Sequence, residues 1–411
     1  MALVWLVSCW AAGYVGAVAK VCFTATKRHE HRATIIARVL LVRPCAGAPT
    51  WLAATLPTWP RTSVRELRWV AAIQDRTDPA WQVAADARSQ LSRAKPDVHV
   101  VATAAVGPNH KVDQLACAVE TLGDDRDVLV VADSDVDLDA LQLDAMMSPL
   151  AHPEIAACWC PTIEVAPRTL ADGVSATILI GSLHAFTLLA SLDSALFVGK
   201  VFAVRTAALA AAGGLGALRH HLGEDFELAR RLRTLGLATV QSPTVARSLA
   251  HGRDLRAVLA RHTRWFSVLR AQRPRVLIGV PLLIAAAPLL LLAAATIAAH
   301  APHTALAVAT VVIAARLGVV WLGHRRGGQR VRVAALLLAL PADLVLLAAF
   351  VRSLTGRSVR WADRTLRLGA DGRLEPIPAE REPHGRDAIQ GAGRKSGDAA
   401  DRLRPEHRGD E

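Results

Sequence analysis

Two aspartates, Asp133 and Asp135, directly follow an apolar run at residues 128–132. A continuous apolar run is typical of a fully buried strand, and open α/β sheets bind ligands at the carboxyl ends of their strands. Two carboxylates one residue apart repel each other, and a divalent cation relieves the repulsion. Mg²⁺ and Mn²⁺ prefer such oxygen ligands and usually lie between carboxylates and substrate phosphates. The pair therefore predicts a metal and diphosphate site, with a solvated turn as the alternative.

Three further features have residue types that could take part in chemistry. Asp75 ends an apolar run at residues 69–73. Glu224 and Asp225 open a predicted helix, where an aspartate can also serve only as a cap. Residues 261–265 read Arg-His-Thr-Arg-Trp and lie beside apolar runs long enough to cross a membrane. The functional prediction rests on these features occurring together and in this order.

Strands and helices alternate across residues 35–250, and they would position these residues. This alternation favours an α/β fold with a mostly parallel sheet. The expected strands are 36–42, closed by Arg43-Pro44, then 69–73, 98–102 and 128–132, and the expected helices include 79–94, 112–122, 208–215 and 226–235.

Apolar runs that could span a bilayer flank this domain. Positive residues (Lys27, Arg28 and Arg32) follow the first run instead of preceding it, which argues against a secretory signal and places the N-terminus outside and the domain in the cytosol. Residues 251–275 are basic and amphipathic, which suits a helix in the membrane interface. The apolar runs are residues 2–24, 276–299, 303–322 and 331–351.

These runs leave a conflict in the predicted topology. Four full spans from an outside N-terminus would leave the C-terminus outside, whereas several arginines after residue 351 favour the cytosol. Either one run is re-entrant, with Pro341 interrupting the last, or the C-terminal segment departs from the rule. From about residue 380 the chain has almost no large apolar residues, which predicts disorder.

The composition excludes several classes of protein. A hydrophobic content of 52% and a mean hydropathy of +0.28 are too apolar for an ordinary soluble protein of 411 residues. The net charge is +12, but the basic residues flank apolar runs or crowd the C-terminus. Anionic lipid is therefore a better partner than nucleic acid. The six cysteines form neither a disulfide framework nor a zinc site.

The ordered set of aspartates followed by Arg-His-Thr-Arg-Trp resembles the pattern of the ceramide glucosyltransferase family, glycosyltransferase family 21. Members are membrane-embedded GT-A enzymes with three aspartate sites before an R/Q-x-x-R-W motif. The resemblance covers about residues 1–370, and the bacterial hopanoid-associated glycosyltransferases share this plan most fully. Shorter matches are Asn109-His110-Lys111, Gly181-Ser182-Leu183-His184, and Arg360-Trp361 with Gly369.

The resemblance implies a role for each candidate residue. Asp133 and Asp135 would hold a divalent cation, Mg²⁺ or Mn²⁺, with the donor diphosphate, and Asp225 would be the general base. An arginine suits a diphosphate through its bidentate fork, although at a membrane interface it often only snorkels. The substrate-binding residues would be Asp75 (for the uridine), Lys111, His184, Arg261, Arg264 and Trp265. For Lys111 a solvated helix start, and for His184 an ordinary buried histidine, are the alternatives.

The resemblance implies an inverting hexosyltransferase that moves glucose or N-acetylglucosamine from a UDP-sugar to a lipid hydroxyl, of a hopanoid polyol or a ceramide. The catalytic domain would face the cytosol on a bacterial inner membrane. The alternatives are a processive polysaccharide synthase, since those carry Q-x-x-R-W, and an inactive membrane scaffold. Lys200 and the short region 213–225 depart from the family pattern, which concerns the acceptor more than the chemistry.

The expected domain boundaries follow from these features. They are an N-terminal anchor at 1–26, a cytosolic GT-A domain at 27–250, an interfacial helix at 251–275, transmembrane helices at 276–352, a basic segment at 353–379 and a disordered tail at 380–411.

Overall fold

The computed structural model describes residues 1–26, 37–192, 196–356, 358–361, 364–369 and 371–376. The predicted disorder after residue 380 and the basic residues Lys27, Arg28 and Arg32 lie outside this described part of the chain. Residues Met1–Pro376 form one compact unit.

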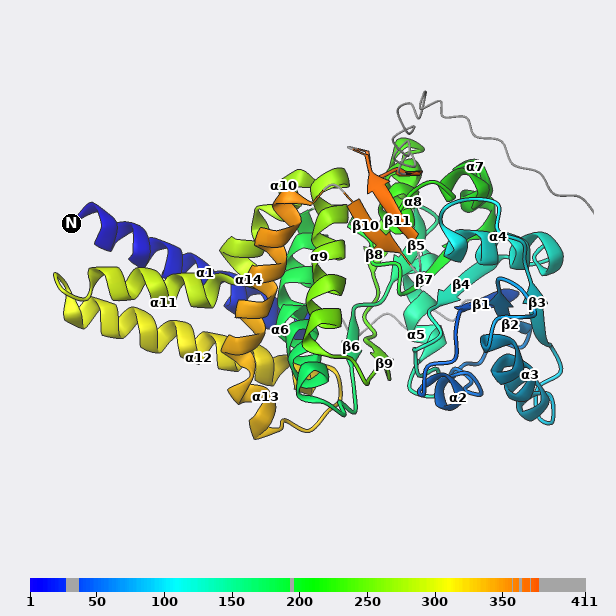
Figure 1. Cartoon of the computed structure of the whole chain (residues 1–411), viewed down its shortest axis with the longest axis horizontal. Helices are drawn as coiled ribbons and strands as arrows, with labels where there is room; N and C mark the ends of the chain where they lie inside the picture. Colours follow the sequence, from blue (N-terminus) through cyan, green and yellow to red (C-terminus); the bar gives the residue numbers. More distant parts are fainter. Residues whose placement is uncertain (27–36, 193–195, 357, 362–363, 370, 377–411) are drawn as a thin grey trace, which may run out of the picture. The chain divides into compact units, whose positions relative to one another are not determined.

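A seven-stranded, mostly parallel sheet is the central element (Figure 1). The strand order is β3-β2-β1-β4-β7-β5-β8, and only β7 runs antiparallel to its neighbours. The expected α/β class with a mostly parallel sheet is therefore confirmed. The strands are β1 (Val39–Cys45), β2 (Leu67–Ile73), β3 (Val98–Ala102), β4 (Val128–Ala132), β5 (Ile155–Trp159), β7 (Val201–Arg205) and β8 (Ala238–Gln241).

Strand β1 extends further than its sequence suggests. The expectation that Arg43-Pro44 closes the strand is wrong, because β1 continues to Cys45. It pairs with β4 only as far as Val42, whereas its pairing with β2 continues to Cys45. Pro44 has no N–H to donate, and it is tolerated because it lies beyond the last pair with β4.

Helices cover both faces of the sheet and bury two apolar clusters. Val39 and Leu41 of β1 belong to one cluster, and Leu40 and Val42 belong to the other, as the two-residue period of a strand requires. The helices of this domain are α2 (Leu52–Thr55), α3 (Ala80–Leu91), α4 (His110–Leu122), α5 (Leu143–Met147), α7 (Thr206–Ala211) and α8 (Glu224–Thr234). A small parallel pair, β6 (Thr162–Glu164) with β9 (Ala246–Ser248), lies beside them.

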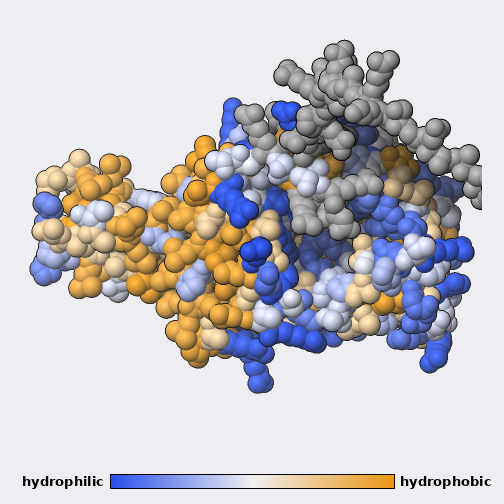
Figure 2. Space-filling model, viewed as in Figure 1, coloured by the Kyte–Doolittle hydropathy of each residue, from blue (hydrophilic) through white to orange (hydrophobic). Residues whose placement is uncertain are grey.

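Three helices run side by side away from the sheet: α1 (Ala2–Thr26), α11 (Ala286–Ile297) and α12 (Pro302–Arg326) (Figure 1). Figure 2 shows hydrophobic residues gathered over these helices and hydrophilic residues over the sheet. In the described part of the chain, three helices are long and apolar enough to cross a membrane. They are Ala2–Lys20, Leu170–Ala190 and Pro302–Arg326, with a fourth span if Pro274–Ile284 and Ala286–Ile297, bent by 59°, count as one.

A second group of helices runs across these three, between them and the sheet (Figure 1). It contains α6 (Leu170–Leu192), α9 (Leu255–Gln272) and α14 (Ala339–Thr355), which share an apolar cluster. The apolar helix α6 was not anticipated from the sequence. The expected run 331–351 is divided between α13 (Val333–Leu337) and α14. Pro341 lies in the first turn of α14, where a missing N–H costs no helical hydrogen bond.

A three-stranded antiparallel sheet follows α14 and lies against the loop before α8. Its strands are β10 (Ser358–Trp361), β11 (Arg364–Leu368) and β12 (Leu374–Pro376). The N–H of Leu374 donates to His220 O at 2.6 Å, and the N–H of Leu222 donates to Gly372 O at 3.1 Å. The C-terminal strands are therefore attached to the domain that carries the central sheet.

Candidate active site

The two aspartates after β4 are each paired with a lysine. Asp133 Oδ1 lies 3.0 Å from Lys111 Nζ, and Asp135 Oδ2 lies 2.6 Å from Lys200 Nζ. Ser248 Oγ also donates to Asp135 Oδ2, at 2.8 Å. Burial alone would raise the pKa of Asp135, but Lys200 and the Ser248 hydroxyl hold it below its usual value. Asp135 is therefore ionised at neutral pH.

Lys111 connects the aspartate pair to the start of α8. Its Nζ lies 3.1 Å from Glu224 Oε1 and donates to Gly199 O at 3.0 Å. Burial alone would lower the pKa of Lys111, but Asp133 and Glu224 raise it above its usual value. Lys111 is therefore a fixed positive charge between two carboxylates.

The buried Arg43 holds the loop that carries the aspartates. Its Nη2 donates to Ser134 O at 2.9 Å and to Val136 O at 2.6 Å, and its Nη1 donates to Thr55 O at 2.6 Å. Burial lowers the pKa of Arg43 to about 10, which leaves the guanidinium charged at neutral pH. The backbone around the aspartate pair is thus fixed by contacts within the protein.

Asp225 lies one residue inside α8, whose N-cap residue is Gly223. The helix-cap alternative therefore does not describe its position. Its Oδ2 accepts from Gly199 N–H at 2.7 Å, and its Oδ1 accepts from Phe226 N–H at 2.9 Å. Burial, and then the neighbouring Glu224 carboxylate, raise the pKa of Asp225 to about 7. A carboxylate with this pKa can accept a proton near neutral pH.

The Arg-x-x-Arg-Trp segment lies on α9 and is joined to β6 by ion pairs. Glu164 is contacted by Arg261 and by Arg253, whose Nη1 lies 2.7 Å from Glu164 Oε1. Burial alone would raise the pKa of Glu164, but the two guanidiniums hold it well below its usual range. The Arg261 guanidinium also lies over the ring of Trp265, 4.5 Å from its centroid. Arg261 and Trp265 are therefore held in one arrangement.

One cavity of about 450 Å³ is shared by the aspartate pair, its two lysines, Asp225 and the Arg-x-x-Arg-Trp segment. Its apolar wall comes from α6, α9 and the segment after α9, and its polar wall comes from the ends of the central sheet, α8 and α9. The polar lining includes Lys111, Asp133, Asp135, Lys200, Asp225, Arg253, Arg261, Arg264 and Trp265, and the apolar lining includes Leu179, Phe186, Leu189, Phe266, Leu269, Val276 and Ile284. A ligand with both charged and apolar parts would fit these two walls.

The model of the family described as Glycosyl transferase family 21 matches residues 3–374. The chain belongs to glycosyl transferase family 21. The match extends from α1 to β12, so the helices that run away from the sheet and the C-terminal strands belong to the matched region. The protein is a glycosyltransferase, and its mostly parallel sheet is of the expected α/β class.

Two solved structures are similar to this family 21 protein. A mannosyltransferase from Pyrobaculum calidifontis, in complex with GDP-Man and Mn²⁺, is 18% identical, with 86% of this chain and 99% of that chain covered and a TM-score of 0.45. The glucosyl-3-phosphoglycerate synthase of Mycobacterium tuberculosis is 19% identical, with 56% of this chain and 80% of that chain covered and a TM-score of 0.34. No curated protein matches the chain.

Among the described residues, Asp75 and His184 are the only predicted site residues of this family 21 protein that do not line the cavity. Asp75 is exposed just beyond β2, and its Oδ1 accepts from Thr77 N–H at 2.6 Å. Hydrogen bonds from Thr77 and then Asp78 lower the pKa of Asp75. His184 is buried in α6, and the Gly181 of the same motif accepts from Arg316 Nη1 at 2.8 Å. The Gly-x-x-His motif therefore packs against α12.

Sequence reasoning missed three charged residues that organise the site. The only sign of Lys200 in the sequence is its departure from the family pattern. Its partner Asp135 is 65 residues away, so no local pattern indicates the pairing. Glu164 lies in a three-residue strand, and Arg253 lies before α9 begins, so neither belongs to a periodic pattern.

The aspartate pair has the oxygen ligands that a divalent cation prefers, and both residues line the cavity. Asp135 Oδ2 is taken by Lys200 and Ser248, whereas the buried Asp135 Oδ1 accepts no hydrogen bond from any residue that the structure describes. Within the described ranges, no three His, Cys, Asp or Glu side chains lie close enough to hold an ion by themselves. A cation here would therefore need further oxygens, such as those of a diphosphate, which is the usual situation for Mg²⁺.

Proposed function

We propose that this protein transfers a hexose, glucose or N-acetylglucosamine, from a UDP-sugar to the hydroxyl of a membrane lipid such as a hopanoid polyol or a ceramide, with inversion. The observation that supports this most strongly is the cavity, in which Asp133, Asp135 and Asp225 share one space with apolar side chains of α6 and α9. A lipid whose hydroxyl reaches Asp225 needs such an apolar wall, whereas a sugar acceptor does not.

The donor binds at the polar wall. Lys111 meets the diphosphate as a point charge and Arg264 meets it through its planar fork. Asp75, which is exposed beyond β2 and outside the lining of the cavity, would bind the uridine where the donor extends past the cavity. Charge that builds up on the departing UDP is stabilised by these fixed cations, which lowers the barrier to transfer. A Mg²⁺ or Mn²⁺ ion held by Asp133 and Asp135 would supply further positive charge to the same diphosphate.

Asp225 is the proposed general base. The acceptor oxygen forms a bond to the anomeric carbon on the face opposite the UDP, and the carboxylate of Asp225 takes the hydroxyl proton. The bond between the anomeric carbon and the phosphate oxygen breaks, and its electrons leave with UDP. One displacement of this kind inverts the anomeric centre. A pKa of about 7 makes Asp225 basic enough to accept the proton and substantially ionised at neutral pH.

We also propose that three segments cross a bacterial inner membrane: α1, the bent segment ending in α11, and α12. The helices α6, α9 and α14 would lie in the cytosolic interface, because they run across the other three (Figure 1). With an outside N-terminus, three crossings leave the sheet, the end of α12 and strands β10–β12 in the cytosol. This arrangement removes the conflict between an outside N-terminus and a basic C-terminal segment.

The test is transfer of label. Membranes that contain the protein are incubated with labelled UDP-glucose or UDP-N-acetylglucosamine, and the lipids are extracted. Label in one discrete lipid is the expected result. Label in a polymer would favour a polysaccharide synthase, and no label with any donor or lipid would favour an inactive scaffold.

A further inference from the structure

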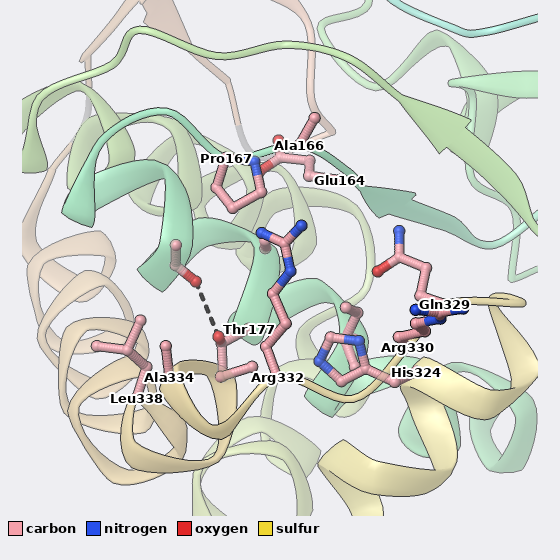
Figure 3. Close-up of a pocket in the computed structure, with 14 residues that line it drawn as sticks. Glu164, Ala166, Pro167, Thr177, His324, Gln329, Arg330, Arg332, Ala334 and Leu338 are labelled. Carbon is pink, nitrogen blue, oxygen red and sulfur yellow. Dashed lines mark hydrogen bonds between the residues drawn. The ribbon is translucent and has the colours of Figure 1, made fainter.

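A second cavity, of about 410 Å³, lies between α6 and the connection from α12 to α13 (Figure 3). Two arginines of the connection, Arg330 and Arg332, contribute to its lining. The apolar part of the lining includes Ile180 of α6, together with Ala334 and Leu338 from α13 and its C-terminal end. This cavity thus combines basic and apolar walls, and it is separate from the cavity that holds Asp225.

The start of the connection is held against the small β6–β9 sheet. Arg247 of β9 donates from Nη2 to Gly327 O at 3.0 Å and to Gly328 O at 3.3 Å. Gly328 has a φ of +62°, a conformation that glycine adopts without strain. The N–H of Gln329 then donates to His324 O at 2.9 Å, so the chain turns back toward the end of α12. The backbone just before Arg330 is therefore fixed in place.

The charge around this cavity is positive. Arg330 and Arg332 are exposed, and neither forms an ion pair with a residue in the described part of the chain. In Figure 3 the Arg332 side chain extends between Thr177 and His324 toward Pro167. The only carboxylate among the lining residues described is Glu164, whose charge is opposed by two arginines, Arg253 and Arg261. An anion that enters meets two unpaired guanidiniums.

The helix beside the cavity exposes apolar side chains. Val333 is 72% exposed and Leu337 is 74% exposed, and both belong to α13. Exposed large aliphatic residues next to arginines are typical of a segment at a membrane surface, where the apolar side chains enter the lipid and the arginines remain at the head groups. The cavity therefore opens beside a surface suited to lipid.

We propose that this cavity binds an anionic phospholipid. Arg330 and Arg332 contact the phosphate, and an acyl chain lies along Ile180 and Leu338. Basic pockets between helices on the cytosolic side of a membrane bind acidic lipid head groups, because the positive side chains and the negative head group attract each other where little water screens them. The occupant is a lipid, and not free phosphate, because the apolar part of the lining gives inorganic phosphate nothing to contact.

The experiment measures binding of phosphatidylglycerol to the purified full-length protein in a neutral detergent, by native mass spectrometry. Phosphatidylcholine and inorganic phosphate are the comparison ligands. The double substitution R330Q and R332Q removes two charges from the cavity, and the matched control, R88Q with R93Q, removes two exposed charges in and after α3. A third variant, A334W, keeps the arginines and fills the apolar part from the exposed position Ala334.

Wild-type protein and the α3 control are expected to bind phosphatidylglycerol in preference to phosphatidylcholine. R330Q with R332Q should weaken that binding about 25-fold, from roughly a factor of five for each basic residue near the membrane. A334W should weaken it as well, and each variant should keep wild-type affinity for the UDP-sugar. Equal phosphatidylglycerol binding by wild type and R330Q with R332Q would overturn the proposal. Displacement of the lipid by an equal concentration of inorganic phosphate would overturn the assignment to a lipid.

Discussion

Lys200 Nζ lies 2.6 Å from Asp135 Oδ2, so one oxygen of this cavity-lining carboxylate is bound by a lysine, whereas the buried Oδ1 accepts no hydrogen bond from any described residue. Lys200 and Ser248 neutralise and orient Oδ2. The other oxygen, Oδ1, is left for a ligand. An aspartate held in this way is preorganised, because its side chain does not have to reorient when a cation and a diphosphate arrive.

Asp135→Asn should lower turnover about 100-fold or more, because a bound metal contributes several kcal/mol of charge stabilisation and a neutral amide is a poor ligand. The matched control is Ser248→Ala, which removes a hydrogen bond from Oδ2 and leaves Oδ1 unchanged. It should cost about 1 kcal/mol of stability and little turnover. Turnover is measured with and without EDTA. If neither EDTA nor Asp135→Asn reduced it, the metal site would be wrongly assigned.

Asp225→Asn should reduce turnover by about 10²–10⁴ and leave the Kd for the UDP-sugar nearly unchanged, because a general base acts only at the chemical step. Asparagine keeps one acceptor oxygen, so it can retain the bond from Gly199 N–H or from Phe226 N–H but not both, and a loss of about 1 kcal/mol of stability is expected beside the loss of turnover. Glu224→Gln is the control, since it changes the adjacent carboxylate and should be milder. Wild-type turnover in Asp225→Asn would show that the base lies elsewhere.

The pH dependence of turnover follows from the raised pKa of Asp225. Burial and Glu224 raise this pKa to about 7, so the ionised, basic form should increase as the pH rises through about 7. Turnover at saturating donor should rise over the same range and then level. In Glu224→Gln the rise should move to lower pH, because the neighbouring negative charge is gone. A profile that does not move in Glu224→Gln would contradict this cause of the shift.

The three-crossing topology predicts which residues face the cytosol. In a cysteine-free background, Asp371→Cys, in the turn between β11 and β12, should react with a membrane-impermeant maleimide at the cytosolic face of inverted vesicles. His303→Cys, at the start of α12, should react only after the vesicles are opened. Both positions are exposed in the folded protein, so the side of the membrane on which each cysteine lies decides whether it reacts. A protected Asp371→Cys would mean that α14 also crosses the membrane.

The sequence predicts the sheet well where one local pattern determines the structure. The boundaries of β3 and β4 agree with their apolar runs, and the aspartates follow β4 directly because a buried strand leaves only its end for charged residues. The chain order of the aspartates and the Arg-x-x-Arg-Trp segment also predicts that Asp133, Asp225 and Arg261 share a site, and they line one cavity.

What the sequence does not predict depends on contacts between distant segments. The apolar residues of α6 do not indicate whether a helix crosses a membrane or packs beneath one, since both environments favour the same side chains. Whether the 17-residue α14 crosses a membrane or lies beside it depends in the same way on its packing against α9 and α6. The pairing of Lys200 with Asp135 follows from the fold alone, as does that of Glu164 with Arg261.

The proposed activity is transfer of a sugar from UDP to a lipid hydroxyl within one cavity. The most direct measurement uses purified protein in nanodiscs of phosphatidylcholine that contain one hydroxyl-bearing lipid acceptor, with the UDP released and the labelled lipid formed both counted. Both products should form in equal amounts, and neither should form without the acceptor. UDP release that is independent of the lipid, or label found in a polymer, would contradict it.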